Sequence, residues 1–221
     1  MGRLSTVVFD LDGTLVRYHG VEFESSWGAI AAAAGVQEES ERLLREYFPR
    51  RDAYSDWVAK DAQLLVGVPV AAIAAKIFPP PYADGVPGAI ARLRDHYRLG
   101  IVSSGVDLVA NRVLEELGLD FAVANRLFIE NGRFTGESET VVDLWKKDEV
   151  LQQVAERRGI HLNEVCYVGD HVNDIPVMRR VGLSIAYNPK DEGLAQIADY
   201  VVHNFGEIPA VVEAFSVSTG S

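Results

Sequence analysis

The chain has 221 residues, of which 48% are hydrophobic and 24% charged, a composition typical of a globular protein with its own core. Its 32 acidic and 21 basic side chains give a net charge of -11, which repels phosphate backbones and argues against DNA or RNA as a partner. The single cysteine, Cys166, excludes an internal disulfide and a multi-cysteine zinc site. With no recognisable export signal and no apolar run of membrane-spanning length, we expect a cytoplasmic protein without membrane association.

Short apolar runs alternate with segments of helical spacing along most of the chain. We expect strands at residues 6–9, 99–102, 165–168 and 183–186, and helices at residues 87–97, 107–117, 147–158 and 174–181. The strands are almost entirely apolar, as in strands that are covered on both faces. The alternation therefore predicts an α/β fold, a doubly wound parallel sheet with helices on both sides.

One segment, residues 18–81, interrupts this alternation with several helix-like stretches and no convincing strand. Its far edge is Pro79-Pro80-Pro81, which cannot continue a helix. We therefore expect a core formed by residues 1–17 and 82–221 and a helical domain, residues 18–81, inserted after the first strand. A pair of short strands around Asn131-Gly132 is expected as a hairpin within the core.

Two carboxylates follow the first predicted strand, in the run Asp10-Leu11-Asp12-Gly13-Thr14. Side chains two positions apart point to the same side of a strand, and parallel sheets bind ligands beyond the carboxyl ends of their strands. A simple turn needs one aspartate rather than the pair. Asp10 and Asp12 are therefore candidate catalytic residues.

A second acidic run, Gly169-Asp170-His171-Val172-Asn173-Asp174, follows the strand at residues 165–168. Oxygen ligands from two strand ends suit Mg²⁺, which leaves positions open for a substrate phosphate. The structural alternative is a turn in which Asn173 or Asp174 caps the next helix.

A hydroxyl and backbone N–H groups in Ser103-Ser104-Gly105, just before a predicted helix, suit a phosphoryl oxygen. The plain alternative is an N-cap role for Ser103 or Ser104. Lys146 and Lys147 begin another helix, where a cation is slightly unfavourable with the helix dipole, so either a local use or a solvated surface pair explains them.

These four segments, in this order, resemble the haloacid dehalogenase superfamily and, within it, the phosphoserine-phosphatase-like branch. The similarity is closest over residues 102–136 and 165–188, and it is weakest in the insert, whose position and length are similar to those of the family's cap domain. The resemblance implies a Rossmann-like core and Mg²⁺-dependent hydrolysis of a small phosphorylated metabolite.

The resemblance also implies a role for each candidate. Asp10 attacks phosphorus to form an aspartyl-phosphate, and Asp12 protonates the leaving alcohol and then activates water. Asp10, the backbone carbonyl of Asp12, and Asp170 hold the metal. Ser103 and Lys147 contact the phosphoryl oxygens.

Several further roles come from the same resemblance. Ser104 and Gly105 extend the phosphate site, and Asn173 and Asp174 support the metal and its waters. Lys147 is preferred to Lys146 because its spacing to the helix matches the family.

The insert departs from the pattern expected for phosphoserine. A glutamate for the serine ammonium and an arginine for its carboxylate are expected, but the corresponding places fall near His19 and Asp61. Local shifts would bring Glu22 or Glu24 and Arg50 or Arg51 into those roles, but a solvated helix face is the favoured explanation for all four. We therefore predict that phosphoserine is not strongly preferred.

Other functions remain open on the sequence. Phosphoserine phosphatase proper and a phosphotransferase would use the same intermediate, and a non-catalytic metal- or phosphate-binding module is the least favoured alternative. The aromatic residues of the insert are expected to form its core rather than a substrate platform. His171 is expected to be a loop histidine, and a position leaning over the site is the alternative. The aromatic residues in question are Trp27, Tyr47, Tyr54 and Trp57.

Overall fold

The computed structural model describes residues 4–218. The first three residues, which begin the segment searched for an export signal, lie outside the described part. Within residues 4–218 no helix is both long enough and apolar enough to cross a membrane.

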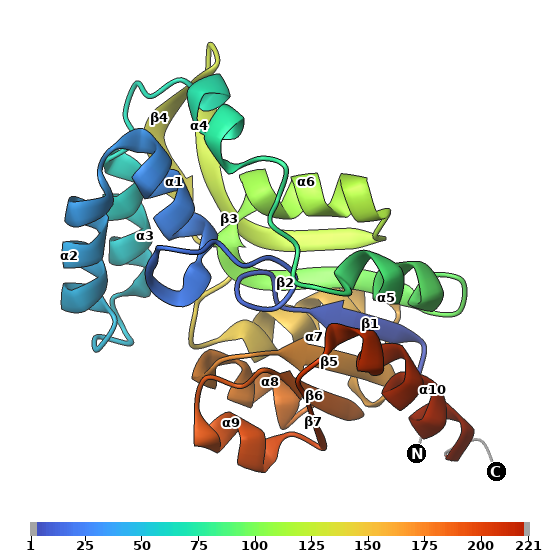
Figure 1. Ribbon diagram of the computed structural model, residues 1–221. Helices are drawn as coiled ribbons and strands as arrows, with labels where there is room; N and C mark the ends of the chain where they lie inside the picture. Colours follow the sequence, from blue (N-terminus) through green and yellow to red (C-terminus); the bar gives the residue numbers. More distant parts are fainter. Residues whose placement is uncertain (1–3, 219–221) are drawn as a thin grey trace.

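Seven strands form one sheet, in the order β4-β3-β2-β1-β5-β6-β7 (Figure 1). The strands are β1 (Thr6–Phe9), β2 (Arg98–Val106), β3 (Phe121–Glu130), β4 (Arg133–Glu139), β5 (Val165–Gly169), β6 (Leu183–Tyr187) and β7 (Tyr200–Val202). All neighbouring pairs are parallel except β3 and β4, which form an antiparallel hairpin. The doubly wound parallel core is thus confirmed.

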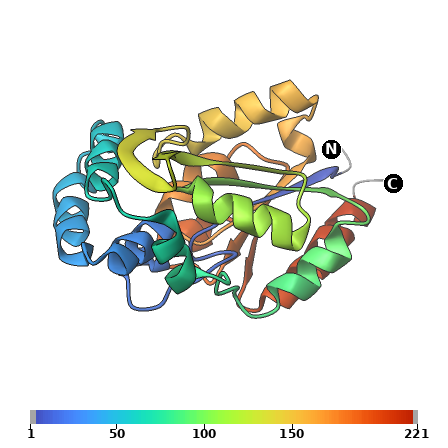
Figure 2. The ribbon, with the colours of Figure 1, turned by 90° about the horizontal axis from the view of Figure 1, so that it is seen from above.

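The helices cover both faces of this sheet (Figure 2). The α-helices are α1 (Ser26–Ala34), α2 (Gln37–Tyr47), α3 (Tyr54–Gln63), α4 (Val70–Ile77), α5 (Val86–Leu93), α6 (Asp107–Leu117), α7 (Lys147–Arg158), α8 (Ile175–Met178), α9 (Glu192–Ile197) and α10 (Ile208–Ser218). Single 3-10 turns are η1 (Glu22–Glu24), η2 (Leu162–Glu164), η3 (Val172–Asp174) and η4 (Phe205–Glu207).

Alternate residues of β1 pack into two separate cores. Val7 and Phe9 contact the cluster that contains α5, α6 and α10, whereas Val8 belongs to the cluster with α7, α8 and α9. This period of two is the pattern of a strand that is buried on both faces. It leaves Asp10 at the carboxyl edge of the sheet, where β1 ends between β2 and β5.

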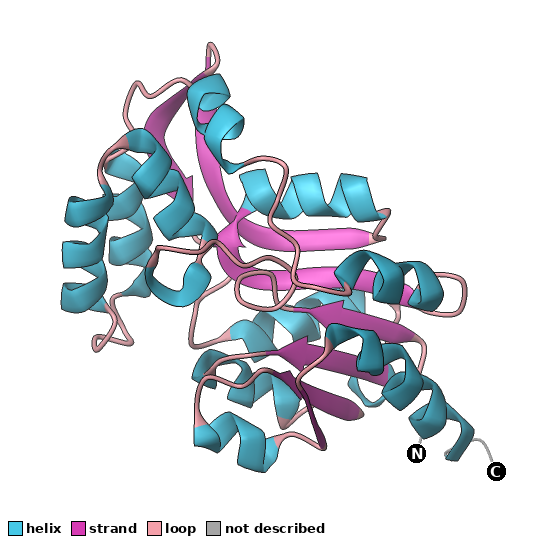
Figure 3. Ribbon diagram, viewed as in Figure 1, coloured by secondary structure: helices cyan, strands magenta, loops and turns pink. Residues whose placement is uncertain are grey.

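The segment between β1 and β2 contains helices and loops, and α1 to α4 gather at one end of the molecule (Figure 3). The β3–β4 hairpin reaches this group. Gly67 N–H donates to the Phe134 carbonyl at 2.9 Å, and Phe134 N–H donates to the Val68 carbonyl at 3.1 Å. The hairpin expected in the core therefore also fixes the position of the insert.

Several elements differ from the sequence-based expectation. The hairpin is longer than predicted because β3 begins at Phe121 and pairs with β2 before it turns into β4. Strand β7 was not predicted from the sequence, because its apolar run is short and two of its three residues are exposed. The helix expected over residues 174–181 is only the four-residue α8.

Candidate active site

Asp10 lies at the end of β1 with its carboxylate almost fully buried. Its Oδ2 is 2.8 Å from Lys147 Nζ, and its Oδ1 accepts a hydrogen bond from Leu11 N–H at 2.8 Å. Burial raises the pKa of Asp10, and the Lys147 cation and a hydrogen bond from Ser103 oppose this shift. The carboxylate is thus fixed in position while it still faces the cavity described below.

Lys147, at the start of α7, is completely buried, whereas Lys146 is exposed. The Nζ atom of Lys147 lies 2.8 Å from Asp10 Oδ2 and 2.8 Å from Asp174 Oδ1. Burial lowers the pKa of Lys147, but these two carboxylates more than offset that effect and hold the pKa above its usual value. The lysine is therefore a fixed cation directly behind Asp10.

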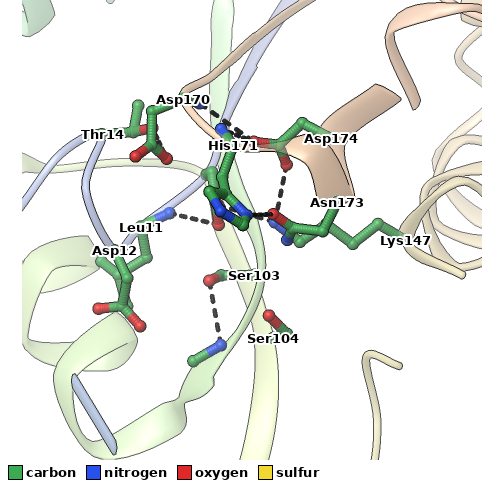
Figure 4. A network of polar contacts seen from close by, with 12 residues as sticks. Leu11, Asp12, Thr14, Ser103, Ser104, Lys147, Asp170, His171, Asn173 and Asp174 are labelled. Atoms are coloured by element: carbon green, nitrogen blue, oxygen red, sulfur yellow. Dashed lines mark hydrogen bonds and ion pairs between the residues drawn. The ribbon is translucent and has the colours of Figure 1, made fainter. Parts of the chain in front are cut away.

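Four groups donate hydrogen bonds to Asp174, and Figure 4 shows Lys147, Asp170 and His171 around it. Lys147 Nζ and Tyr167 Oη donate to its Oδ1, both at 2.8 Å, and the N–H groups of Asp170 and His171 donate to Oδ2 at 3.1 and 3.3 Å. With both oxygens satisfied, Asp174 orients Lys147 and the loop after β5.

Asp12 is the second carboxylate of the first motif and lies beside the beginning of α1. Its Oδ1 accepts a hydrogen bond from Ser26 N–H at 2.8 Å, and its Oδ2 accepts one from Ser26 Oγ at 2.7 Å. Burial raises the pKa of Asp12 to about 7, with Ser26 opposing the shift and Asp10 adding to it. A carboxyl group with this pKa both gives and takes a proton near neutral pH.

Asp170, at the end of β5, completes the acidic edge. Thr14 Oγ1 donates to its Oδ1 at 3.2 Å, and Lys190 Nζ lies 3.0 Å from its Oδ2. Burial raises the pKa of Asp170 to about 7, and Lys190 opposes that shift. Gly13 is required here, because a Cβ at this position would lie 2.2 Å from Asp170 Oδ2 and its φ is +78°.

The acidic edge fits a divalent metal ion. Carboxylate oxygens of Asp10, Asp170 and Asp174 lie within 4.8 Å of one another. Asp174 accepts two hydrogen bonds on each carboxylate oxygen, whereas each oxygen of Asp170 has one contact, with Thr14 Oγ1 or with Lys190 Nζ. Asp10 and Asp170 also line the cavity and Asp174 does not, so Asp10 and Asp170 are the better direct ligands, and hard oxygen donors suit Mg²⁺.

The serine motif differs in detail from its prediction. Strand β2 continues through Ser103, Ser104 and Gly105, and the N-cap of α6 is Val106, so neither serine caps the helix. Gly105 N–H donates to Ser103 Oγ at 3.1 Å, and Val106 N–H donates to Ser26 Oγ at 3.1 Å. These two N–H groups are thus engaged within the protein, contrary to the free N–H groups that the sequence suggested.

The Ser104 carbonyl ties the insert to the core. It accepts hydrogen bonds from Trp27 Nε1 at 3.1 Å, Tyr54 Oη at 3.0 Å and Asn125 Nδ2 at 2.8 Å. Sequence reasoning missed this network, because its members lie far apart in the chain. It also missed Thr14, Ser26 and Lys190, although Lys190 follows β6, and the rule used for β1 and β5 applies equally to that strand end.

His171 lines the cavity, which corresponds to the alternative considered for it rather than to a plain loop histidine. It is half-buried, and its ring lies 5.1 Å from Phe23 and 6.4 Å from Phe48, both from the insert. Its Nδ1 is 3.2 Å from Asn173 Oδ1, and burial lowers the pKa of His171. Burial thus favours the neutral imidazole, and its ring contacts the insert.

A cavity of about 120 Å³ lies between the carboxyl edge of the sheet and the insert. The core lines it with Asp10, Asp12, Ser103, Ser104, Gly105, Asp170, His171, Asn173 and Lys190. Lys147 and Asp174 lie behind this wall. The structure thus brings every residue of the sequence-based site into the wall or directly behind it.

Half of the insert residues that line the cavity are aromatic or acidic. Trp27, Tyr54 and Trp57 line the cavity as well as packing within the protein, where Tyr54 is buried and Trp27 contacts the hydrophobic core. Tyr47 is buried and lies outside the lining. The rings line the cavity because α1 and α3 present them toward the end of β2.

Some of the residues considered for serine recognition line the cavity and others do not. Asp61 and Glu22 line the cavity, while His19, Arg50 and Arg51 do not. Glu24 also lies outside the lining, where Arg17 and Lys190 pair with it.

We predict that Asp61→Asn stabilises the protein at neutral pH. Burial raises the pKa of Asp61 to about 7. The unfolded chain ionises this group near pH 4, so the carboxyl group costs increasing stability as the pH rises from about 4 to 7. The variant should gain up to about 4 kcal/mol at pH 8 and almost nothing at pH 4, as measured by urea unfolding. An equal gain at both pH values would contradict this account, and the exposed Asp56→Asn on the same helix is the control.

Comparison with known proteins places the chain in a well-defined group. Residues 7–179 match the family model of haloacid dehalogenase-like hydrolases. The chain is 33% identical over 186 residues to a phosphoserine phosphatase of Methanocaldococcus jannaschii, covering 83% of this chain and 85% of that protein. It is 27% identical over 208 residues to a phosphoserine phosphatase of Lactococcus lactis, covering 91% of each. A solved phosphoserine phosphatase structure with an analogue of the phospho-aspartyl intermediate superposes with a TM-score of 0.78 at 31% identity, covering 95% of this chain and 99% of that chain.

Proposed function

The chain belongs to the haloacid dehalogenase-like hydrolase family, as a phosphoserine-phosphatase-like phosphatase, and from this premise we propose that it hydrolyses a small phosphate monoester through Asp10. One observation carries the proposal. Two carboxylates two residues apart, one beside a buried lysine and the other with a pKa of about 7, face the same cavity. A nucleophile and a proton donor are thus present together.

In the proposed first step, an Asp10 carboxylate oxygen attacks phosphorus and the bond between phosphorus and the alcohol oxygen breaks. Asp12 gives its proton to that oxygen, so the alcohol leaves uncharged and Asp10 carries the phosphoryl group. Lys147 and Ser103 offset the negative charge that develops around Asp10. Leu11 N–H and Lys147 keep the nucleophile in place between the two steps.

In the second step, water attacks the aspartyl-phosphate and Asp12, now ionised, accepts a proton from it. Phosphate is released, and both aspartates return to their starting states. Ser26 holds the Asp12 carboxylate with two hydrogen bonds in an orientation that serves both steps. A pKa near 7 suits the alternation between acid and base.

We propose Mg²⁺ as the cofactor, with Asp10, Asp170 and the backbone carbonyl of Asp12 as its protein ligands. The ion would neutralise phosphoryl charge as a Lewis acid. The buried Asp170 Oδ2, whose contact is the Lys190 cation at 3.0 Å, supports this assignment, as does the oxygen-only donor set. Asn173 and Asp174 would support the loop that carries Asp170.

Residues 18–81 are proposed to act as a cap over residues 1–17 and 82–221, because their aromatic rings form the wall of the cavity opposite Asp10. Such a cap excludes water and selects the leaving group. The relatives named above are phosphoserine phosphatases, which supports a small phosphorylated metabolite as the substrate.

Removal of divalent metal is expected to reduce turnover by about 100-fold or more, and added Mg²⁺ should restore it. The measurement is phosphate release from p-nitrophenyl phosphate by chelator-dialysed protein. Full activity without any divalent ion would contradict the metal assignment. Adding a simple alcohol tests the related phosphotransferase alternative, because transfer would yield a new phosphate ester in place of free phosphate.

A further inference from the structure

The two sides of the cavity carry opposite charges. At the sheet edge, Lys190 lies among the lining residues and Lys147 lies directly behind Asp10, so cations are available to a phosphoryl group. The insert wall carries three carboxylates, those of Glu22, Glu41 and Asp61, and no lysine or arginine of the insert lines the cavity. The end of the cavity that receives the leaving group is therefore acidic.

Asp61 is the most informative of these carboxylates. Its side chain is only 6% exposed, it lines the cavity from α3, and its Oδ1 accepts a hydrogen bond from Ser40 Oγ at 3.0 Å. Among residues 4–218, no lysine, arginine or histidine nitrogen lies within 4.0 Å of it. A buried carboxylate without a cation is costly, and a cationic ligand would remove that cost.

The two arginines nearest to Asp61 in the sequence contact other residues. Arg50 pairs with Glu46 and lies over the Tyr47 ring at 4.8 Å, while Arg51 lies over the Trp145 ring at 4.3 Å. A substrate carboxylate in this end of the cavity would therefore meet Asp61 and no cation. Repulsion and desolvation would both weaken its binding.

The aromatic rings that line the same cavity add a second preference. Trp27, Tyr54 and Trp57 line the cavity, and the Tyr54 and Trp57 rings meet edge to face with centroids 5.8 Å apart. Aromatic faces attract organic ammonium groups, including methylated ones. Acid and aromatic groups together are the usual surroundings of such a cation.

We propose that the substrate is the phosphate ester of an amino alcohol, with an ammonium group and no carboxylate, and that Asp61 receives the ammonium. This inference rests on the proposed phosphatase function and specifies its leaving group. The reaction is unchanged, because the amino alcohol departs with the proton supplied by Asp12.

A substrate panel tests the proposal directly. We expect kcat/KM for phosphoethanolamine or phosphocholine to exceed that for glycerol phosphate, which is neutral in its leaving group, by at least about 10-fold. Phosphoserine, which has the ammonium and also a carboxylate, should be a poorer substrate than the better of these two esters. A phosphoserine value equal to or above theirs would overturn the proposal.

Asp61→Asn and Asp56→Asn form a matched pair of variants. Both remove one carboxylate from α3, but Asp56 is exposed and lies outside the cavity lining. Asp61→Asn should reduce the ratio of ammonium-ester to glycerol-phosphate kcat/KM by about 10-fold, and Asp56→Asn should leave that ratio as in the wild type. An unchanged ratio in Asp61→Asn would contradict the proposed contact.

A binding measurement separates this inference from the proposed function. Choline or ethanolamine should raise the Tm of the wild type and of Asp56→Asn in a concentration-dependent manner, and should have little effect on Asp61→Asn. Glycerol is the neutral control. Absence of phosphatase activity in the wild type towards every ester tested would refute the proposed function. Equal Tm shifts in the three proteins, or no Tm shift in any of them, would refute the ammonium site alone.

Discussion

Asp10→Asn is expected to abolish turnover, lowering kcat by about 10⁴-fold or more, while the protein stays folded. The amide lacks the charged oxygen that would attack phosphorus, yet it preserves the shape of the side chain at the end of β1. Lys147 retains Asp174 as an anionic partner at 2.8 Å, so no buried cation is left alone. The measurement is phosphate release with Mg²⁺, accompanied by a thermal unfolding curve.

Asp12→Asn is the control for this variant, because it changes the neighbouring carboxylate and keeps the nucleophile. It should slow hydrolysis by about 10²–10⁴-fold through loss of proton transfer. It should still form the phosphoenzyme from p-nitrophenyl phosphate, whose leaving group needs little protonation. If Asp10→Asn retained near wild-type activity, the covalent route would be wrong whatever the behaviour of Asp12→Asn.

Lys147→Met is the second change with a large expected effect. Methionine has a similar length but no charge, so Asp10 and Asp174 would lose the ammonium that contacts both of them. Breaking a buried ion pair on one side typically costs about 3–5 kcal/mol. We also expect a fall in kcat of about 10²–10³-fold, because charge that develops around Asp10 is no longer offset.

Lys146→Met provides the matched comparison, since Lys146 is the exposed neighbour. It should leave stability and turnover close to those of the wild type. Urea unfolding and phosphate release measure both properties for the two variants. Equal effects of the two substitutions would show that the buried contacts of Lys147 have no special role.

The general form of the core could be predicted because it depends on local patterns. Buried strands such as Val165–Gly169 have short apolar runs, and the aspartates that follow them stand out at the carboxyl ends. The same rule brings Asp10 and Asp170 to one edge, since β1 and β5 are parallel neighbours in the sheet. The pattern of apolar residues and the parallel direction of the strands were sufficient to predict the core and the place of these aspartates.

The insert wall depends on contacts between distant segments, and its chemistry was harder to predict. The spacing of Trp27, Tyr54 and Trp57 fits the core of a helical domain equally well, and only the approach of α1 and α3 to β2 turns the rings toward a cavity. Asp61 was identified by its place in the chain. Its burial and its lack of a cationic partner follow only from the packing of α2 against α3.

The bounds of β3 were also difficult to predict from the sequence. Strand β3 begins as a buried parallel strand and continues as an exposed antiparallel one, so no single hydrophobic period describes it. The strand that follows it, β4, contacts the insert through Phe134, a contact between segments more than sixty residues apart.

The most direct test of the central claim is the site of phosphoryl attachment during turnover. Protein is mixed with p-nitrophenyl phosphate labelled with radioactive phosphorus, quenched in acid within one turnover, digested and analysed by mass spectrometry. We predict that the label lies on Asp10, accumulates further in Asp12→Asn, and is absent from Asp10→Asn. Label on any other residue, or rapid phosphate release with no labelled protein at any time, would contradict the proposed mechanism.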